Sequence, residues 1–156
     1  MAAPTFRFLY REAERPIGPG LWARASALPV GAALAMTAIA WVIAPGPRDL
    51  ASQPFFSVSI VAVHAYLLVY GFALMFLSVM QYFVSAKRFL DLGKPTAWAG
   101  LAPFALLLAG AAAWFQPRSE GLMPEWALYP SYGFALAVIV WNVAVLGFVK
   151  RPRRGL

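Results

Sequence analysis

The chain has 156 residues, of which 62% are hydrophobic and only 12% are charged. Charged residues approach a quarter of an ordinary soluble domain, so this composition excludes a soluble globular protein and indicates an integral membrane protein. The net charge is +7, but the basic residues lie mostly between hydrophobic blocks, where positive charge reports topology. We therefore expect contact with membrane lipids and no binding of nucleic acid.

The chain contains no cysteine, which excludes disulfide bonds, thiolate metal sites and iron–sulfur clusters. Residues 1–24 lack an apolar run and carry four arginines and two glutamates. We therefore expect no cleavable signal peptide.

The N-terminal segment, residues 1–24, is predicted to be cytoplasmic or interfacial. Within residues 4–15, the apolar side chains recur at helical spacing and arginines occupy the other side; the apolar set is Phe6, Leu9, Tyr10 and Ala13. This pattern predicts a short amphipathic helix with its apolar face in the lipid, and a disordered tail is the alternative. Residues 17–24, IGPGLWAR, resemble a turn whose Trp22 and Arg24 anchor at the head-group level.

Four hydrophobic stretches follow, each near the roughly 20 residues that cross a bilayer core of about 30 Å. We place them at about 25–44, 55–84, 96–115 and 132–149, within a membrane domain of residues 25–149 that a basic tail, residues 150–156, follows. The second stretch is the longest, and no Asp, Glu, Lys or Arg interrupts it from Phe55 to Phe83. The sequence therefore predicts an all-α integral membrane protein built as a four-transmembrane-helix bundle.

The distribution of Lys and Arg predicts the orientation of the bundle. Eleven of the thirteen lie in the N-terminal segment, the second loop and the C-terminal tail, and the first and third loops hold Arg48 and Arg118. Positive residues concentrate on the cytoplasmic side. We therefore expect both termini and the second loop in the cytoplasm, with the protein in the bacterial inner membrane.

Small or polar residues recur at every seventh position of the second span, at Ser57, His64, Gly71, Ser78 and Ser85. Helices associate in lipid through close backbone approach and hydrogen bonds, so their interfaces favour such residues. We interpret the stripe as a packing seam, with chance recurrence as the alternative.

A basic corner ends the second span, formed by Lys87, Arg88, Asp91, Gly93 and Lys94. Glycine followed by Pro95 is a typical end of a helix. Arg88 and Asp91 are three positions apart and can pair on one face. As a surface pair they would contribute about 0–1 kcal/mol, while Lys87 and Lys94 would meet lipid phosphates. A docking point for an acidic loop of a partner is the alternative.

Residues 86–101, AKRFLDLGKPTAWAGL, resemble the corresponding stretch of the DUF805 family of small bacterial inner-membrane proteins. The matching positions are Lys87, Arg88, Asp91, Gly93, Lys94 and Trp98, whereas Leu90 stands where many members have His. Residues 17–22 are similar to the glycine-containing motif near the family's N-terminus. The resemblance implies the same four-span topology and assigns no activity.

His64 and Asn142 are the candidate functional groups inside the spans. Both lie nine or ten residues from the predicted periplasmic side, about 14–15 Å deep, so they could meet. His64 is a weak candidate as a haem ligand, proton relay or quinone hydrogen-bond donor, and we favour a hydrogen bond between helices, to Asn142 or to a backbone carbonyl. No metal site and no cofactor are predicted.

Catalysis is not expected, because the chain offers no evident pair of nucleophile and base. Glu120 and Glu125, in the third loop, are more typical of a solvated periplasmic surface than of an acid–base pair. The leading hypothesis is a non-catalytic accessory or assembly subunit that packs against other membrane protein subunits, in a respiratory or photosynthetic electron-transfer complex. The alternatives are a small carrier or a lipid-, haem- or quinone-binding protein that uses His64 and Asn142, and a membrane enzyme that uses the loop glutamates.

Overall fold

The computed structural model describes residues 5–11, 15–43, 58–116, 119 and 122–149, and every regular element within them is helical. The elements are α1 (Phe6–Tyr10), α2 (Pro19–Ile43), α4 (Val58–Asp91), η1 (Thr96–Gly100), α5 (Leu101–Phe115), η3 (Glu125–Leu128), α6 (Tyr129–Val143) and η4 (Ala144–Phe148). Four helical stretches are long and apolar enough to cross a membrane: Pro19–Ile43, Val58–Asp91, Thr96–Phe115 and Glu125–Phe148. The prediction of an all-helical chain with four membrane-spanning helices is confirmed at this level.

Three boundaries differ from those of the predicted spans, one of them being the start of the last stretch, at Glu125 rather than near residue 132. The first long helix begins at Pro19 rather than near residue 25, because proline is favourable in a first turn, where its missing N–H has no helical partner. The second runs to Asp91, beyond the predicted membrane span of 55–84 and up to the helix end predicted at Gly93. The basic pair Lys87 and Arg88 therefore lies in the last turns of this helix.

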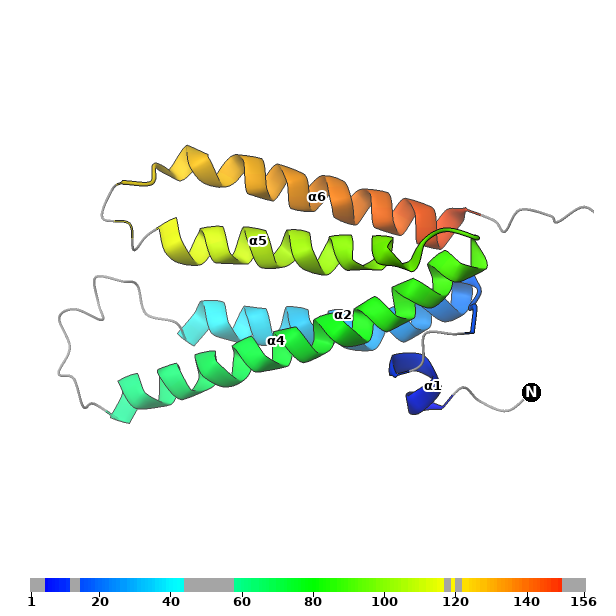
Figure 1. Cartoon of the computed structure of the whole chain (residues 1–156). Coiled ribbons are helices and arrows are strands. Elements are labelled where there is room, and N and C mark those ends of the chain that lie inside the picture. The colour runs from blue at the N-terminus through cyan, green and yellow to red at the C-terminus, as the bar shows by residue number, and fades with distance from the viewer. Residues whose placement is uncertain (1–4, 12–14, 44–57, 117–118, 120–121, 150–156) are drawn as a thin grey trace, which may run out of the picture.

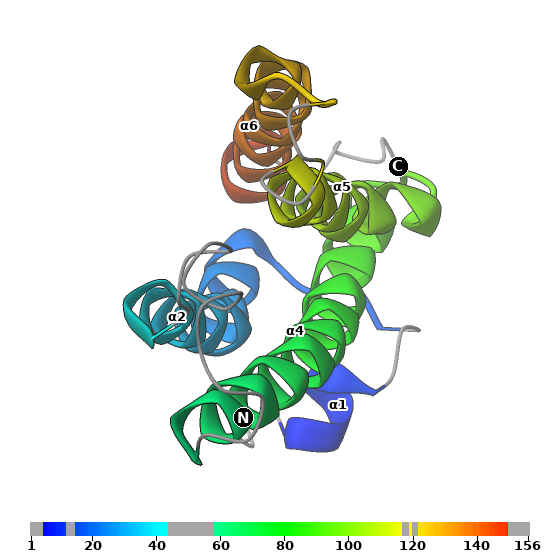
Figure 2. The ribbon, with the colours of Figure 1, turned by 90° about the vertical axis from the view of Figure 1, so that its left-hand side faces the viewer.

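The long helices form two antiparallel hairpins, α2 with α4 and α5 with α6 (Figure 1). Viewed from one end, α5 and α6 lie on one side and α2 and α4 on the other, with α4 leading into α5 (Figure 2). Helix α4 has 34 residues and is about 51 Å long at 1.5 Å per residue. It therefore exceeds a bilayer core of about 30 Å, and its last turns carry the basic corner.

A glycine terminates α4 as predicted. Gly93 has a φ of 67°, a left-handed conformation that L side chains rarely adopt. The Gly93 N–H donates to the Leu90 carbonyl at 3.0 Å, and the Lys94 N–H donates to the Phe89 carbonyl at 2.9 Å. These two bonds form a Schellman motif, which satisfies the carbonyls at the helix end and reverses the chain toward α5.

The core consists of two clusters of buried residues. The larger cluster gathers α1, the start of α2, the end of α4 and η4 around the corner, and includes Tyr10, Trp22, Val84, Phe89 and Leu146. The ring of Trp141 stacks on Phe89 with centroids 5.9 Å apart, and Trp98 lies 5.7 Å from Trp141. The smaller cluster joins α5 to α6 through Ala105, Ala109, Ala135 and Val138. Small residues there allow two backbones to approach closely.

Helix α1 packs against protein through the side that was predicted to face lipid. Thr5 caps its first turn by accepting a hydrogen bond from the Phe8 N–H at 3.3 Å. Tyr10 is buried, and Phe8 and Leu9 pack on the larger cluster, whereas Phe6 is exposed. Ala13 lies outside the described residues. The helix is therefore docked on the bundle by the end of its apolar face.

Candidate functional site

Arg88 connects the end of α4 to the end of the last helix. Its Nε donates to the Leu146 carbonyl at 2.9 Å, its Nη2 donates to the Val149 carbonyl, and its Nη1 forms an ion pair with Asp91. The last carbonyls of a helix have no partner within the helix. Arg88 therefore supplies donors to the C-terminal end of η4 while Asp91 compensates its charge.

Lys87 does the same for the first helix of the chain. Its Nζ donates to the Leu9 carbonyl at 3.1 Å and lies 4.2 Å from the centroid of the Phe8 ring. Leu9 lies in the last turn of α1, and its carbonyl has no donor within that helix. Two adjacent cations of α4 thus cap two helices from the opposite ends of the sequence.

The predicted exposure of the basic corner was wrong for its central pair. The side chains of Lys87 and Arg88 are 0% exposed, although Lys94 is exposed as expected. The Arg88–Asp91 pair exists, but it is a buried pair, for which desolvation makes the loss of one partner costly. The difference arises because backbone carbonyls and the Phe8 ring, rather than lipid phosphates, surround these cations.

Tyr10 satisfies a carbonyl that a proline leaves without a donor. Pro29 lies inside α2 and has no N–H, so the carbonyl four residues earlier, at Ala25, receives no helical hydrogen bond. The Tyr10 hydroxyl donates to that carbonyl at 2.9 Å. Burial raises the pKa of Tyr10 above its ordinary value of 10.0, so the phenol remains a neutral donor at physiological pH.

A polar cluster joins α2 to α4 next to this site. The side-chain amide of Gln81 donates through Nε2 to the hydroxyls of Ser26 at 3.1 Å and Ser85 at 3.3 Å. The indole N–H of Trp22 also donates to Ser85, at 3.4 Å. Trp22 is therefore a core residue, and its predicted role as a head-group anchor was wrong. Within the described residues, the buried Oε1 of Gln81 accepts no hydrogen bond.

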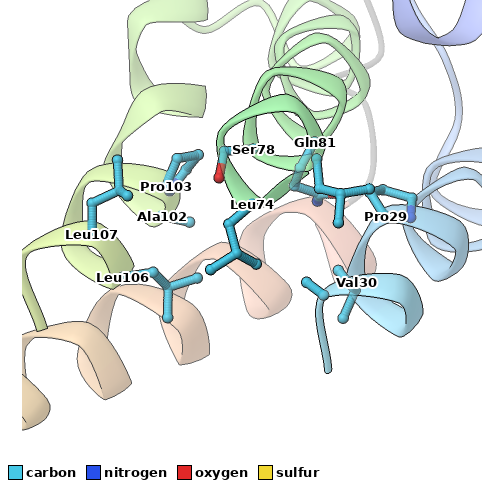
Figure 3. A pocket seen from close by; sticks show the side chains of 11 residues that line it. Pro29, Val30, Leu74, Ser78, Gln81, Ala102, Pro103, Leu106 and Leu107 are labelled. Atoms are coloured by element: carbon cyan, nitrogen blue, oxygen red, sulfur yellow. The ribbon is translucent and has the colours of Figure 1, made fainter. Parts of the chain in front are cut away.

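A cavity of about 150 Å³ lies beside the polar cluster, between α2, α4 and α5 (Figure 3). Its walls are apolar except at Ser78 and Gln81; the lining residues are Pro29, Val30, Ala33, Leu74, Leu77, Ser78, Gln81, Ala102, Pro103, Leu106 and Leu107. The α4 residues of this set are near the middle of that helix. The cavity therefore lies inside the membrane-spanning part of the bundle.

The stripe of small residues does not follow the seam between α2 and α4. Ser85 is buried in the seam and Ser78 lines the cavity, but His64 and Gly71 are exposed, and Ser57 lies outside the described residues. The seam instead uses tyrosines: Tyr66 donates to the Met36 carbonyl at 2.8 Å, and the hydroxyl of Tyr70 lies 2.9 Å from that of Thr37. Long side chains therefore bridge α2 and α4 there.

His64 and Asn142 do not meet. The Nδ1 of His64 lies 2.8 Å from the Ile60 carbonyl of its own helix, whereas Asn142 is buried beside Trp141, whose ring stacks on Phe89. Phe89 is 25 positions beyond His64 on α4, or about 37 Å along the helix. The equal depths inferred from the predicted span boundaries were wrong. Asn142 Nδ2 has no hydrogen-bond acceptor within the described residues.

The features that sequence reasoning missed are the roles of Tyr10, Ser26 and Gln81. Pro29 inside an apolar helix was a usable signal for Tyr10, because it marks an unsatisfied carbonyl four residues earlier. Nothing in the spacing of the sequence identifies which hydroxyl reaches that carbonyl. Of the two loop glutamates, Glu125 is exposed and Glu120 lies outside the described residues. The described residues contain no group of three or more His, Cys, Asp or Glu side chains that could hold a metal ion.

Comparison with known proteins found no matching family model, and neither curated proteins nor solved structures gave a significant match. The resemblance to DUF805 proteins therefore stays a prediction carried by the corner residues.

Proposed function

We propose that the chain is a non-catalytic accessory or assembly subunit of the bacterial inner membrane that packs through α4 against another integral membrane protein. The observation that carries this proposal is the outward position of His64. Polar residues within spans usually contact protein. Since His64 is exposed on this chain and its Nδ1 lies 2.8 Å from the Ile60 carbonyl, a neighbouring subunit would contact the Nε2 side of the ring.

The exposed side of α4 has further properties of a packing face. No residue in the most apolar 18-residue stretch of α4 is buried within the chain, whereas 17–22% of the residues are buried in the corresponding stretches of the other three spans. Gly71 shares the side of His64, and an added Cβ there would meet no atom within 4 Å. A small residue on a free face lets the backbone of a second helix approach. The seven-residue stripe then serves association with a partner rather than packing within the chain.

The apolar helices indicate contact with membrane lipids, and lipid is the competing neighbour of the exposed α4 face. Small helical accessory subunits are common in bioenergetic assemblies, so a respiratory or photosynthetic electron-transfer complex is the host that we propose. The alternative of a carrier or a haem- or quinone-binding protein built on His64 and Asn142 gains no support, because these residues occupy different levels of the bundle.

Site-specific photocrosslinking in native membranes tests this proposal. We expect a photoreactive residue at position 64 or 71 to give one protein adduct of defined mass that co-purifies with the chain after mild solubilisation. Phe76 is the matched control, because it is also exposed but lies roughly 140° around the helix from Gly71. Adducts with lipid alone at 64 and 71, together with a chain that always elutes alone, would contradict the proposal.

A further inference from the structure

The cavity between α2, α4 and α5 carries an inference that goes beyond the proposed packing role. We propose that it binds a lipid-soluble phenol: one aromatic ring held by the apolar walls, and one hydroxyl that donates to the side-chain carbonyl of Gln81. The inference combines the size of the cavity, its lining and the buried Oε1 of Gln81 beside it, which has no donor among the described residues.

The size and the lining of the cavity indicate an aromatic ring as the apolar part of the ligand. The cavity has a volume of about 150 Å³, about that of an enclosed apolar cavity that binds benzene, and it opens to the outside of the bundle at Val30, Leu106 and Leu107, which are 44–53% exposed. Pro29 and Pro103 supply rigid rings from α2 and α5, and Leu74 and Leu106 complete the walls (Figure 3). A ring fits such a space with little loss of conformational freedom, whereas a flexible chain loses more on binding.

Gln81 indicates which polar group the ligand carries. Its Nε2 donates to Ser26 and Ser85, while its buried Oε1 accepts no hydrogen bond within the described residues. A buried acceptor without a donor costs free energy that a matching donor recovers. Gln81 is itself a wall of the cavity, and its terminal torsion is soft, so a rotation that exchanges one of the two Nε2 bonds for a bond at Oε1 turns Oε1 toward a donor seated there.

The position of the cavity disfavours charged donors. Its α4 residues, Leu74 to Gln81, lie near the middle of the helix, where a charged donor such as an ammonium is expensive. A neutral hydroxyl avoids that cost. A ligand reaches these mid-helix residues from the lipid phase, so it must be apolar enough to dissolve there.

The test measures binding of 4-fluorophenol and fluorobenzene to the full chain in lipid nanodiscs by ¹⁹F NMR, against protein-free nanodiscs. We expect 4-fluorophenol to bind about tenfold tighter than fluorobenzene, the ratio for one added hydrogen bond. Gln81→Leu keeps binding of fluorobenzene and reduces the preference to about twofold or less. Equal binding of both probes by the unaltered chain, or an unchanged preference in Gln81→Leu, would overturn the proposal.

Filling the cavity locates the binding. Ala33→Phe and Ala102→Phe place a ring in the cavity from opposite walls, at α2 and α5, and each should abolish binding of both probes. Ala35→Phe is the control, because Ala35 is exposed on α2 and does not line the cavity. Binding by a folded Ala33→Phe or Ala102→Phe chain equal to that of Ala35→Phe would place the probes elsewhere and refute the site.

An aliphatic alcohol separates a phenol from other hydroxyl compounds. 6-Fluorohexan-1-ol offers the same donor without the ring, and we expect it to bind more weakly than 4-fluorophenol. Equal binding would refute the assignment of an aromatic ligand. None of these outcomes depends on a partner subunit, so they are independent of the crosslinking result at His64 and Gly71.

Discussion

At the scale of single residues, two buried cations determine how the ends of this chain are held. Lys87 and Arg88 are neighbours in sequence, yet each donates to the end of a different helix, the first and the last of the described chain. A buried cation is tolerated when its charge and its donors are matched. Asp91 and two carbonyls do this for Arg88, so the corner stabilises the fold rather than presenting charge to its surroundings.

Replacing Arg88 should therefore be among the most destabilising single changes. Arg88→Met removes the ion pair with Asp91 and the two hydrogen bonds that Arg88 donates to helix-end carbonyls. We expect a loss of about 3–5 kcal/mol in the free energy of unfolding, measured by denaturant titration in mixed micelles. Lys94→Met, at the exposed position of the same corner, should change it by about 0–1 kcal/mol. Similar effects of the two substitutions would show that burial of Arg88 contributes little.

The docking of α1 should weaken at high pH. Burial raises the pKa of Tyr10 above 10.0, so the folded chain retains the phenolic proton more strongly than the unfolded chain. The stabilisation by the Tyr10–Ala25 hydrogen bond is therefore complete below pH 10 and decreases as the pH rises through the folded-state pKa. The difference in tyrosinate absorbance between the unaltered chain and Tyr10→Phe should titrate above pH 10. A midpoint below 10 would contradict this.

At the scale of elements, helix boundaries were predictable where local chemistry determines them. Gly93 followed by Pro95 correctly marked the end of the second long helix, because a left-handed glycine and a proline act through the backbone alone. The burial of Lys87 and Arg88 was not predictable, since their partners are backbone carbonyls 58 to 78 residues away and every residue type has a carbonyl. Trp22 was misassigned for a related reason: an indole at a helix start suits a membrane surface and a core equally well.

The interplay of Pro29 and Tyr10 predicts a coupling between α2 and α1. Tyr10→Phe alone should cost about 1–3 kcal/mol, because it leaves the Ala25 carbonyl without a donor. Pro29→Ala restores a backbone N–H for that carbonyl, so Tyr10→Phe should cost less than half as much in this background. The free energies of unfolding of the four chains in the double-mutant cycle measure the coupling. Additive effects would mean that the Ala25 carbonyl does not depend on Tyr10.

At the scale of the whole molecule, the pattern of charge and hydropathy was sufficient to predict four spans but not how they pair. Each apolar stretch is long enough to cross a bilayer whatever its neighbours are, so the number of spans followed from length. The seam between α2 and α4 depends on which tyrosine hydroxyl reaches which acceptor. A repeat of small residues at every seventh position does not determine which hydroxyl pairs with which acceptor. The exposed part of that stripe, at His64 and Gly71, remains a predicted surface for a partner.

The orientation of the molecule can be tested directly because the chain has no cysteine. Lys94 is exposed at the corner and Leu122 is 91% exposed near the opposite ends of α5 and α6 (Figure 1). We expect an impermeant maleimide to label Leu122→Cys in intact spheroplasts and Lys94→Cys only in inverted vesicles. This follows from the excess of Lys and Arg on the side of the corner. The reverse pattern would place the termini in the periplasm.

The distance in sequence between Arg88 and its acceptors has a consequence for biosynthesis. During translation, Arg88 is added to the chain 58 residues before Leu146 and 61 residues before Val149, whose carbonyls accept its hydrogen bonds. During that interval the nascent chain must hold a cation whose final acceptors have not been translated. A chain truncated before Leu146 would contain Arg88 without these two carbonyl acceptors. We expect proteolytic quality control to recognise such a chain by the missing hydrogen bonds.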